Sequence, residues 1–389
     1  MLILCANISL SQWIIPVDEV IQRTLERSDQ LKAADALIDH DRLIEKTGGF
    51  IPDPELILES PTGKFMTLGV QQSFAFPTVY AKRKQLARQQ TVLSEKARMI
   101  TTSELRKRIR LVYLEWQSNT AALNMLTVQD SLLLKISQAA GRQYEAGQID
   151  FVEKSYAGIK YTDIHSQYLQ AQVEVEGNRQ MIQRYAGIAD SVALAPLDLA
   201  KLSNDFAFSS GKVDSTTINN TPIMAYHRQR ELINEKAIQL EKNQVFPDMT
   251  IGYLNQADKN TPFPQRLRFG LSVPLWFWQY NTSINAAKTM LAASKSQTAA
   301  GAFELDQAWT TTKNDALKYQ IAMTYFEAEG LAQAAEMTEA ANRMFSSGQY
   351  DFIKYLTTLS DAFLVKQKYL ELVKNYNQAL ISLQHIIGQ

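Results

Sequence analysis

The residues with the most evident chemical roles lie around two short turns, Gly147-Gln148-Ile149-Asp150 and Gly348-Gln349-Tyr350-Asp351. Glycine readily adopts the left-handed conformation that ends a helix, and an aspartate carboxylate accepts hydrogen bonds from the first amides of the next helix. Arg142 and Arg343 precede the turns by about one helical turn, where a cation suits the carbonyl-rich helix end. We therefore expect each turn to join two helices and to present groups that bond backbone, within the chain or in a partner.

Side chains that serve catalysis are scattered along the chain. The four histidines lack a carboxylate or cysteine at metal-ligand spacing: His40, His165, His227 and His385. The sequence has no Gly-x-Ser-x-Gly elbow, phosphate-binding loop or dinucleotide-binding glycine pattern. Methionines such as Met125, Met224, Met290, Met323 and Met337 are spread singly, which favours core packing over a copper site. We expect no enzymatic activity, no catalytic metal and no cofactor.

The composition sets broad limits on fold and partners. With 389 residues, 46% of them hydrophobic, the chain can bury one large core or two ordinary ones. The 40 basic and 40 acidic residues balance, so no net field attracts nucleic acid, and we expect no nucleic-acid partner. The single cysteine, Cys5, excludes a disulfide within the chain and a multi-cysteine metal site.

Residues 1–16 form an N-terminal segment that begins like part of a signal peptide. Met1 to Leu10 is apolar, but no basic region precedes it and no Ala-x-Ala cleavage site follows it. Leu2-Ile3-Leu4-Cys5 loosely matches a lipidation motif, although Leu4 is larger than the residue usual at that position. Lipidation of Cys5 is therefore left open. No stretch approaches the roughly 20 apolar residues of a transmembrane helix, so a membrane crossing would be made by strands.

The chain contains a long internal repeat. Ten positions of the first half are matched in the second half in the same order and without gaps, nine by the same residue and Tyr144 by Phe345. They are Arg142, Tyr144, Gly147, Gln148, Asp150, Phe151, Tyr168, Leu169, Gln183 and Gly187, matched by Arg343, Phe345, Gly348, Gln349, Asp351, Phe352, Tyr369, Leu370, Gln384 and Gly388. The repeats cover 17–189 and 221–389, and the Ser-, Thr-, Asn- and Asp-rich segment 190–220 is a linker with a short helix or strand.

Each repeat begins with a helix, at Val17 to Lys46 and at Pro222 to Gln244, and a strand pair follows. The strand pairs are Pro54 to Ser60 with Phe65 to Phe76, and Met249 to Asn255 with Arg266 to Phe277. In the longer strand of each pair, apolar side chains alternate with small or polar ones. This pattern suits a membrane barrel that is apolar toward lipid and polar toward its lumen, although soluble sandwiches show similar alternation. Arg266 and Arg268 fall on the polar face. They would either line the lumen of the barrel near its rim or lie in a surface loop.

Aromatic residues gather where these strands end, as rings do at a membrane interface. They are Phe74, Phe76 and Tyr80 in the first repeat and Trp276, Phe277, Trp278 and Tyr280 in the second. A buried aromatic cluster is the alternative.

Long helices complete each repeat. From Val79 to Ala146 the chain is nearly free of glycine and proline, and Leu105, Ile109, Val112 and Trp116 follow coiled-coil spacing. A second helix, from Phe151 to Tyr185, returns antiparallel to the first. The second repeat has the same hairpin from Thr282 to Ile387. One hairpin cannot bury its own seam and four strands cannot close a barrel, so the pattern demands oligomerisation.

The duplicated order of helix, strand pair and long helical hairpin, with Tyr144-Glu-Ala-Gly-Gln-Ile-Asp-Phe151 and Phe345-Ser-Ser-Gly-Gln-Tyr-Asp-Phe352, resembles TolC-type outer-membrane efflux proteins. In general texture it resembles their heavy-metal branch, the cobalt-zinc-cadmium type. The resemblance covers nearly the whole chain. It implies a mainly α protein with membrane β-strands, forming a homotrimer with a 12-stranded barrel in the Gram-negative outer membrane and an α-helical tunnel in the periplasm. It implies export of small molecules or metal ions, with an adaptor and an inner-membrane pump as partners.

The resemblance also assigns roles to the turns. In similar proteins the turns form the tunnel tip where adaptor hairpins pack, which makes Arg142, Gly147, Gln148, Asp150, Arg343, Gly348, Gln349 and Asp351 docking candidates. Closely set carboxylates from three chains at Asp150, Glu153, Asp351 and Asp361 would bind cations and restrain opening of an aperture, with plain solvated charge as the alternative. A coiled-coil scaffold without transport is the alternative for the whole chain.

Overall fold

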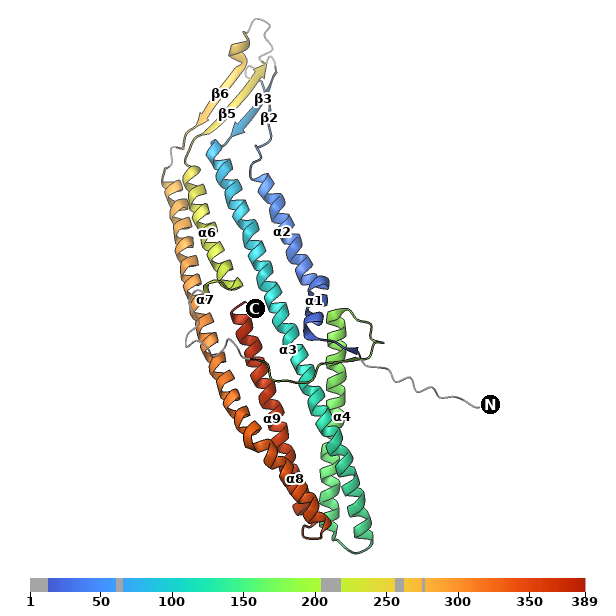
Figure 1. Cartoon of the computed structure of the whole chain (residues 1–389). Coiled ribbons are helices and arrows are strands. Elements are labelled where there is room, and N and C mark those ends of the chain that lie inside the picture. Colours follow the sequence, from blue (N-terminus) through green and yellow to red (C-terminus); the bar gives the residue numbers. More distant parts are fainter. Residues whose placement is uncertain (1–12, 61–65, 204–217, 256–261, 275–276, 389) are drawn as a thin grey trace, which may run out of the picture. The chain divides into compact units, whose positions relative to one another are not determined.

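The computed structural model describes residues 13–60, 66–203, 218–255, 262–274 and 277–388. Several positions named above lie outside the described residues, namely Cys5 with the signal-like segment, Phe65, part of the linker, and Trp276. The described part divides into two compact units (Figure 1). The helical unit comprises Met1–Ser28, Ser103–Val213 and Asp306–Gln389, and the sheet unit comprises Asp29–Thr102 and Asp214–Leu305. Each unit takes segments from both sequence repeats.

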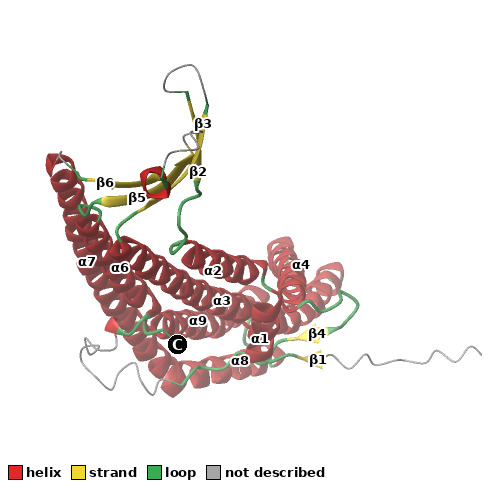
Figure 2. Ribbon diagram, turned by 90° about the horizontal axis from the view of Figure 1, so that it is seen from above, coloured by secondary structure: helices red, strands yellow, loops and turns green. Residues whose placement is uncertain are grey.

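The sheet unit is built around one antiparallel sheet of four strands in the order β2-β3-β5-β6. The strands are β2 (Glu55–Glu59), β3 (Thr67–Phe74), β5 (Asp248–Asn255) and β6 (Leu267–Ser272). Each repeat contributes one strand pair, and β3 pairs with β5 to join the repeats, with Gly69 opposite Leu254 and Ser73 opposite Thr250. Figure 2 shows these strands in yellow. The prediction that the two repeats contribute four strands, in two pairs, to this sheet is confirmed.

Helices lead into and out of the sheet. The sheet unit holds α2 (Asp29–Thr47), α6 (Pro222–Asn243), and the first parts of α3 (Pro77–Glu145) and α7 (Phe277–Tyr325). Proline is the first residue of α3 and of α6, a position where its missing amide hydrogen costs nothing. At the start of α6 the Thr221 hydroxyl caps the helix by accepting a hydrogen bond from the Met224 amide at 3.3 Å.

Two expectations for the sheet unit were wrong in detail. The strand expected to reach Phe277 ends at Ser272, because Pro274 removes a backbone donor and α7 begins at Phe277. Arg266 is not part of this strand. It is the last residue of η1 (Phe263–Arg266), a 3-10 turn that forms where Pro262 and Pro264 fix the backbone.

The first predicted helix, Val17 to Lys46, is also two helices, α1 (Val17–Arg27) and α2. The break occurs at Ser28, which adopts extended backbone angles of φ −60° and ψ 118°. Neither proline nor glycine marks this position, and we have no sequence signal for it beyond the Ser-Asp pair that starts α2.

The helical unit contains two long hairpins. The first pairs the remainder of α3 with α4 (Phe151–Ala186), and the second pairs α7 and α8 (Leu331–Ser346) with α9 (Phe352–Ile386). With 69 residues, α3 is about 100 Å long. Of its predicted seam, Leu105, Ile109 and Trp116 are buried, whereas Val112 is only half-buried. The neighbouring Tyr113 is buried instead, and its hydroxyl donates to the Ile15 carbonyl at 2.6 Å.

The linker and the second hairpin each add a local feature. β4 (Leu194–Ala195) in the linker pairs in parallel with β1 (Trp13–Ile14). In the second hairpin, which begins at Phe277 rather than Thr282, a π-helical turn, η2 (Phe326–Gly330), separates α7 from α8. Tyr369 donates a hydrogen bond to Glu327 of this turn at 3.0 Å. No described helix is long and apolar enough to span a membrane.

Candidate functional site

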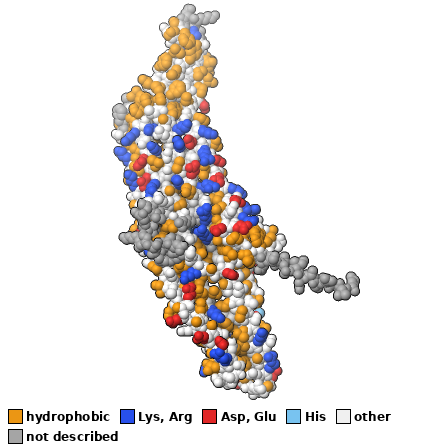
Figure 3. All heavy atoms as spheres, viewed as in Figure 1, with side chains coloured by type: hydrophobic (Ala, Val, Ile, Leu, Met, Phe, Trp, Pro, Cys, Tyr) orange, Lys and Arg blue, Asp and Glu red, His pale blue; other side chains and the backbone are white. Residues whose placement is uncertain are grey.

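One face of the sheet is apolar and open to its surroundings. The pairing register places thirteen residues on this apolar sheet face, with Gln72 and Asn255 as polar exceptions. The other eleven are Leu56, Leu58, Leu68, Val70, Phe74, Met249, Ile251, Tyr253, Leu267, Phe269 and Leu271. Phe269 is 76% exposed, Leu56 75% and Leu271 68%. Figure 3 shows hydrophobic side chains gathered over these strands. A patch of this extent is unusual on a soluble monomer and marks an interaction surface.

The opposite face is mostly small or polar. This polar sheet face comprises Glu55, Glu59, Thr67, Gly69, Gln71, Ser73, Asp248, Thr250, Gly252, Arg268, Gly270 and Ser272, with Ile57 and Leu254 as apolar exceptions. The alternation predicted from the sequence is therefore real, and it continues in register across both repeats.

The sheet curls toward its polar face. Arg268 on the edge strand β6 forms an ion pair with Glu59 on the opposite edge strand β2, with Nη2 and Oε2 3.6 Å apart. These strands are separated by three strand spacings, roughly 14 Å in a flat sheet, and the residues are also offset along the strands. Two side chains can bridge that distance only if the polar face is concave.

Gly69 permits close strand contact within this curved sheet. A Cβ atom added there would lie 2.8 Å from Leu254 Cδ1 and 2.9 Å from the Tyr253 carbonyl oxygen. Backbone cannot yield at such a distance, so a larger residue would push β3 away from β5.

The two arginines predicted for the polar face differ. Arg268 lies on that face, as expected. The Arg266 guanidinium lies 3.5 Å from the hydroxyl of Tyr253, whose side chain belongs to the apolar sheet face. The expectation that Arg266 shares the polar strand face is therefore wrong, because the 3-10 turn ends at this residue and the strand alternation starts after it.

Both helical turns have the caps predicted for them. Gly147 and Gly348 adopt the left-handed conformation with φ of 71° and 75°. The amides of Gln148 and Gln349 donate back into the preceding helix, to the carbonyls of Gln143 at 2.8 Å and Met344 at 2.9 Å. This hydrogen bonding satisfies carbonyls that a helix end leaves without partners.

The aspartates start the following helices. Asp150 accepts a hydrogen bond from the Glu153 amide at 2.8 Å, and the Glu153 carboxylate accepts one from the Asp150 amide. Asp351 accepts one from the Lys354 amide at 2.7 Å. Three of the four carboxylates considered for an aperture therefore have helix-capping roles within one chain. Asp361 lies about three helical turns beyond Asp351 along α9, so the structure does not place it in the turn.

The cations near the turns have varied partners. Arg142 is exposed, and Arg343 forms an exposed ion pair with Glu339 at 2.6 Å. Two lysines that were not predicted from the sequence lie over aromatic rings, Lys154 at 4.6 Å from the Tyr144 centroid and Lys354 at 4.4 Å from that of Tyr350. Lys154 follows Tyr144 by ten residues, on the other side of the first turn, and Lys354 follows Tyr350 by four residues. A tyrosine and a lysine that flank a helix start in this way are the sequence signal for these cation–π pairs.

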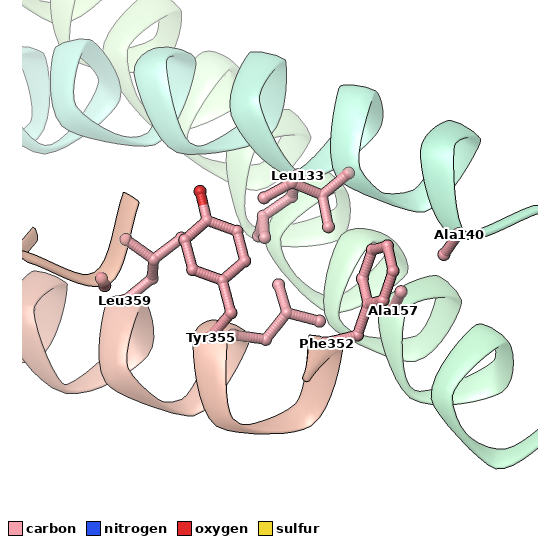
Figure 4. Close-up of a cluster of buried hydrophobic side chains, with 9 residues drawn as sticks. Leu133, Ala140, Ala157, Phe352, Tyr355 and Leu359 are labelled. Atoms are coloured by element: carbon pink, nitrogen blue, oxygen red, sulfur yellow. The ribbon is translucent and has the colours of Figure 1, made fainter. Parts of the chain in front are cut away.

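A hydrophobic cluster holds the two turns at one end of the helical unit (Figure 4). This tip cluster consists of Leu133, Ile136, Ala140, Ala157, Ala341, Phe352, Tyr355, Leu356 and Leu359, from α3, α4, α8 and α9. Ile149 from the first turn and Tyr350 from the second both pack against it. The tip cluster therefore fixes the two hairpins to each other.

The two turns differ in the burial of equivalent aromatic residues. Phe352 is 3% exposed and packs edge-on against Phe345, with ring centroids 4.8 Å apart. Its repeat equivalent Phe151 is 64% exposed, as is its neighbour Val152 at 61%. The first turn thus presents an apolar surface that the second turn keeps inside.

Exposed apolar residues also follow two of the long helices. On α4 they are Val152, Ile159, Leu169 and Val173, and Val173 is 73% exposed. On α7 and α8 within the helical unit, from Asp306 onward, the strongly exposed ones are Ile321 at 71% and Tyr325 at 65%, followed by the exposed small residues Ala328, Ala332 and Ala335. On α4 the spacing by seven, ten and four residues keeps the set on one side of the helix. On α7 and α8 the π-helical turn Phe326–Gly330 interrupts the helical period, so that set is defined by its exposure. We call these sets the α4 stripe and the α7–α8 stripe.

Known proteins share this fold. No known family model matches the chain. The cobalt-zinc-cadmium resistance protein CzcC of Cupriavidus metallidurans is 21% identical over 272 residues, which is 65% of this chain and 60% of that protein. The chain therefore aligns with less than two thirds of the length of that curated relative.

Solved structures match almost the whole chain. A structure of CusC, described as showing conformational changes on folding and transmembrane channel formation, has a TM-score of 0.77 and 13% identity, covering 97% of this chain and 93% of CusC. The outer membrane protein VceC of Vibrio cholerae has a TM-score of 0.77 and 13% identity, covering 96% of each chain.

Proposed function

We propose that this chain, which has the fold of TolC-type outer-membrane channels, is the channel subunit of an efflux system in the outer membrane of a Gram-negative bacterium. The observation that carries the proposal is the exposed apolar sheet face behind a concave polar face. Outside a membrane such a face would remain in water at a cost of roughly 25 cal/mol per Å² of apolar surface.

The sheet has the form of one segment of a barrel. Its edge strands β2 and β6 have a free side each among the described residues, and open sheet edges are not tolerated in lipid. Three copies of four strands would close as a 12-stranded barrel with the polar sheet face toward the lumen. The number three comes from the resemblance to TolC-type proteins, and the curvature of the sheet supports closure.

The helical stripes supply contacts between copies. Val173 and Ile321 are more than 70% exposed in a single chain, in stretches where the opposite side of each helix is packed. We assign the α4 stripe and the α7–α8 stripe to the surfaces that meet when copies close a tunnel. Heptad-like spacing is the pattern by which long helices pack side by side.

The turns are assigned to the periplasmic end of the tunnel, where an adaptor linked to an inner-membrane pump would dock. The docking residues remain those expected, namely Arg142, Gly147, Gln148, Asp150, Arg343, Gly348, Gln349 and Asp351. Exposed Phe151 and Val152 beside the first turn add apolar area for such a contact. Asp150, Glu153 and Asp351 are retained as aperture carboxylates.

For the cargo we propose metal ions or small molecules delivered by the pump. The name of the C. metallidurans relative, a cobalt-zinc-cadmium resistance protein, favours heavy-metal ions. Arg268 and Glu59 on the polar sheet face would then border the exit path. No catalytic step is assigned to this chain.

A pair of single substitutions on neighbouring strands tests the membrane assignment. Leu271→Arg puts a charge on the apolar sheet face, at a cost of about 2–4 kcal/mol near the bilayer midplane. Thr250→Arg puts the same charge on the polar sheet face of the adjacent strand. We expect Leu271→Arg to abolish recovery of the protein in the outer-membrane fraction and Thr250→Arg to leave it largely intact. Equal recovery of both variants would contradict a lipid-facing sheet and favour the scaffold alternative.

A further inference from the structure

A groove runs between α3, α4 and α9 of the helical unit. It lies next to the tip cluster, on the side away from the two turns. Its volume is about 480 Å³, within the range of small-molecule sites. It follows α3 from Ser118 to Leu133, a length of roughly 22 Å. Its apolar lining, which we call the floor, consists of Ala122, Met125, Leu126, Ile164, Phe363 and Leu364, of which Leu364 is 45% exposed. We call this the three-helix groove.

Two buried polar side chains of α3 line the three-helix groove. Gln129 is 3% exposed and Ser118 is 8% exposed, and neither side chain hydrogen-bonds to any group in the described part of the chain. Their spacing of about three helical turns places them on one side of α3. Neither residue is among those whose polar atoms are fully enclosed without a partner, so these polar atoms are accessible from the groove and can bond water or a ligand there. Gln129 in particular offers one acceptor and two donor hydrogens to a molecule in the groove.

The rim of the three-helix groove is acidic. Asp163, Asp361 and Glu371 line it together with Lys160 and Lys374. Lys374 is already paired with Glu115 at 2.7 Å, and Lys160 lies over the ring of Tyr156. Neither Asp361 nor Glu371 has an ion-pair partner among the described residues. The charge left for a ligand is therefore negative.

We propose that the three-helix groove is a binding site for an elongated cationic amphiphile that carries an amide or hydroxyl group. The apolar chain would lie along the floor, the amide would bond Gln129, and the cationic head would lie beside Asp361. Each part of this ligand matches a separate feature of the groove. The site lies within one chain, so the proposal does not depend on the channel function.

Photolabelling tests the proposal in native membranes that contain the full chain. The probe is a dodecylamido-trimethylammonium compound with a diazirine in its chain, and the labelled peptides are mapped by mass spectrometry. We expect labelling of α3 between Ser118 and Leu133 and of α9 between Leu359 and Lys374, suppressed by excess unlabelled probe. A dodecyl sulfate diazirine of the same length should not label these segments. Labels on the apolar sheet face report only exposure to lipid and are scored separately.

Three variants connect labelling to the groove. Asp361→Asn should weaken the apparent affinity by up to about fivefold, the upper range for an exposed charge pair. Gln129→Leu should remove the advantage of the amide probe over a plain dodecyl-trimethylammonium diazirine. Glu336→Gln, which removes an exposed carboxylate of α8 outside the groove, should change nothing.

Two results would overturn the site. One is labelling confined to the sheet, which would mean that the groove is covered in the assembled protein by another copy or a partner. The other is labelling of α3 and α9 that Asp361→Asn and Gln129→Leu leave unchanged, which would mean non-specific partition. Either result leaves the channel assignment standing, because that assignment is tested by Leu271→Arg.

Discussion

At the scale of single residues, the same turn residues have two roles. They set the backbone conformation that ends a helix, and they belong to the proposed docking surface. Gly147 and Gly348 are needed for their positive φ, and a Cβ at either would meet no atom within 4 Å. The space around them is therefore open to a partner. Substitution of a turn glycine by alanine strains the backbone, and its effect on the stability of the chain can be measured without a partner.

A matched pair of glycine substitutions tests the backbone requirement. Gly147→Ala should destabilise the first hairpin by about 1–2 kcal/mol, because alanine is disfavoured at positive φ. Gly141→Ala, in the interior of α3 where the added methyl also meets nothing, should stabilise it by about 0.5–1 kcal/mol. Thermal unfolding followed by circular dichroism gives both signs. A shift in the same direction for both variants would contradict the assigned turn geometry.

Glu176 on α4 provides a prediction about pH. The hydrogen bonds from Arg179, and after them the one from Gln180, lower the pKa of Glu176 from 4.5 to about 2. A lowered pKa contributes stability that is full above pH 4.5 and is lost as the pH falls toward 2. Glu176→Gln should therefore lower the unfolding temperature at pH 6. The loss in free energy of unfolding should be less than about 1 kcal/mol, because the Glu176 side chain is 48% exposed.

The pH series supplies the check on Glu176. The difference between Glu176→Gln and the parent chain should shrink steadily between pH 4.5 and 2. A difference that stays constant over this range would show that the carboxylate is not stabilised by Arg179.

At the scale of elements, periodicity and turn chemistry accounted for most of the fold. Alternation identified the sheet strands, and the absence of glycine and proline identified α3, because both are local properties of the chain. The break at Ser28 and the π-helical turn at Phe326–Gly330 have no such local signal. Tertiary contacts such as the Tyr369 hydrogen bond to Glu327 stabilise features of this kind.

Prediction of the candidate site succeeded where a residue's role was local. The caps at Asp150 and Asp351 could be predicted because they concern neighbouring amides. The different burial of Phe151 and Phe352 could not, since identical residues in matching repeats receive different neighbours from the rest of the fold. Arg266 was misplaced for a third reason, because alternation was extended through a Pro-rich turn.

The α4 stripe leads to a prediction about assembly. Val173→Asp introduces a charge into the surface assigned to contacts between copies, and burying an unpaired carboxylate is costly. We expect the fraction of assembled protein in mild detergent to fall strongly, as measured by light scattering after size-exclusion chromatography. Gln172→Asp, the exposed neighbour on another side of α4, should keep the parent mass. Loss of assembly in both variants, or in neither, would contradict the stripe as an interface.

At the scale of the whole molecule, a single chain exposes several surfaces that an assembly of copies would cover. In the proposed assembly the apolar sheet face would contact lipid, the sheet edges that are unpaired among the described residues would pair with other strands, and the helical stripes would pack on other helices. A closed trimer in a membrane satisfies all three. The same fold occurs in the outer membrane protein VceC and in CusC, whose structure is described in terms of transmembrane channel formation.

The most direct test of the channel is the conductance of the purified particle. The protein would be extracted from membranes in mild detergent, its mass determined, and the same particle placed in a planar bilayer. We predict the mass of three chains and a steady ion current that the Leu271→Arg preparation does not produce. A water-soluble particle that passes no ions would contradict the account and leave a coiled-coil scaffold as the function of the long helices.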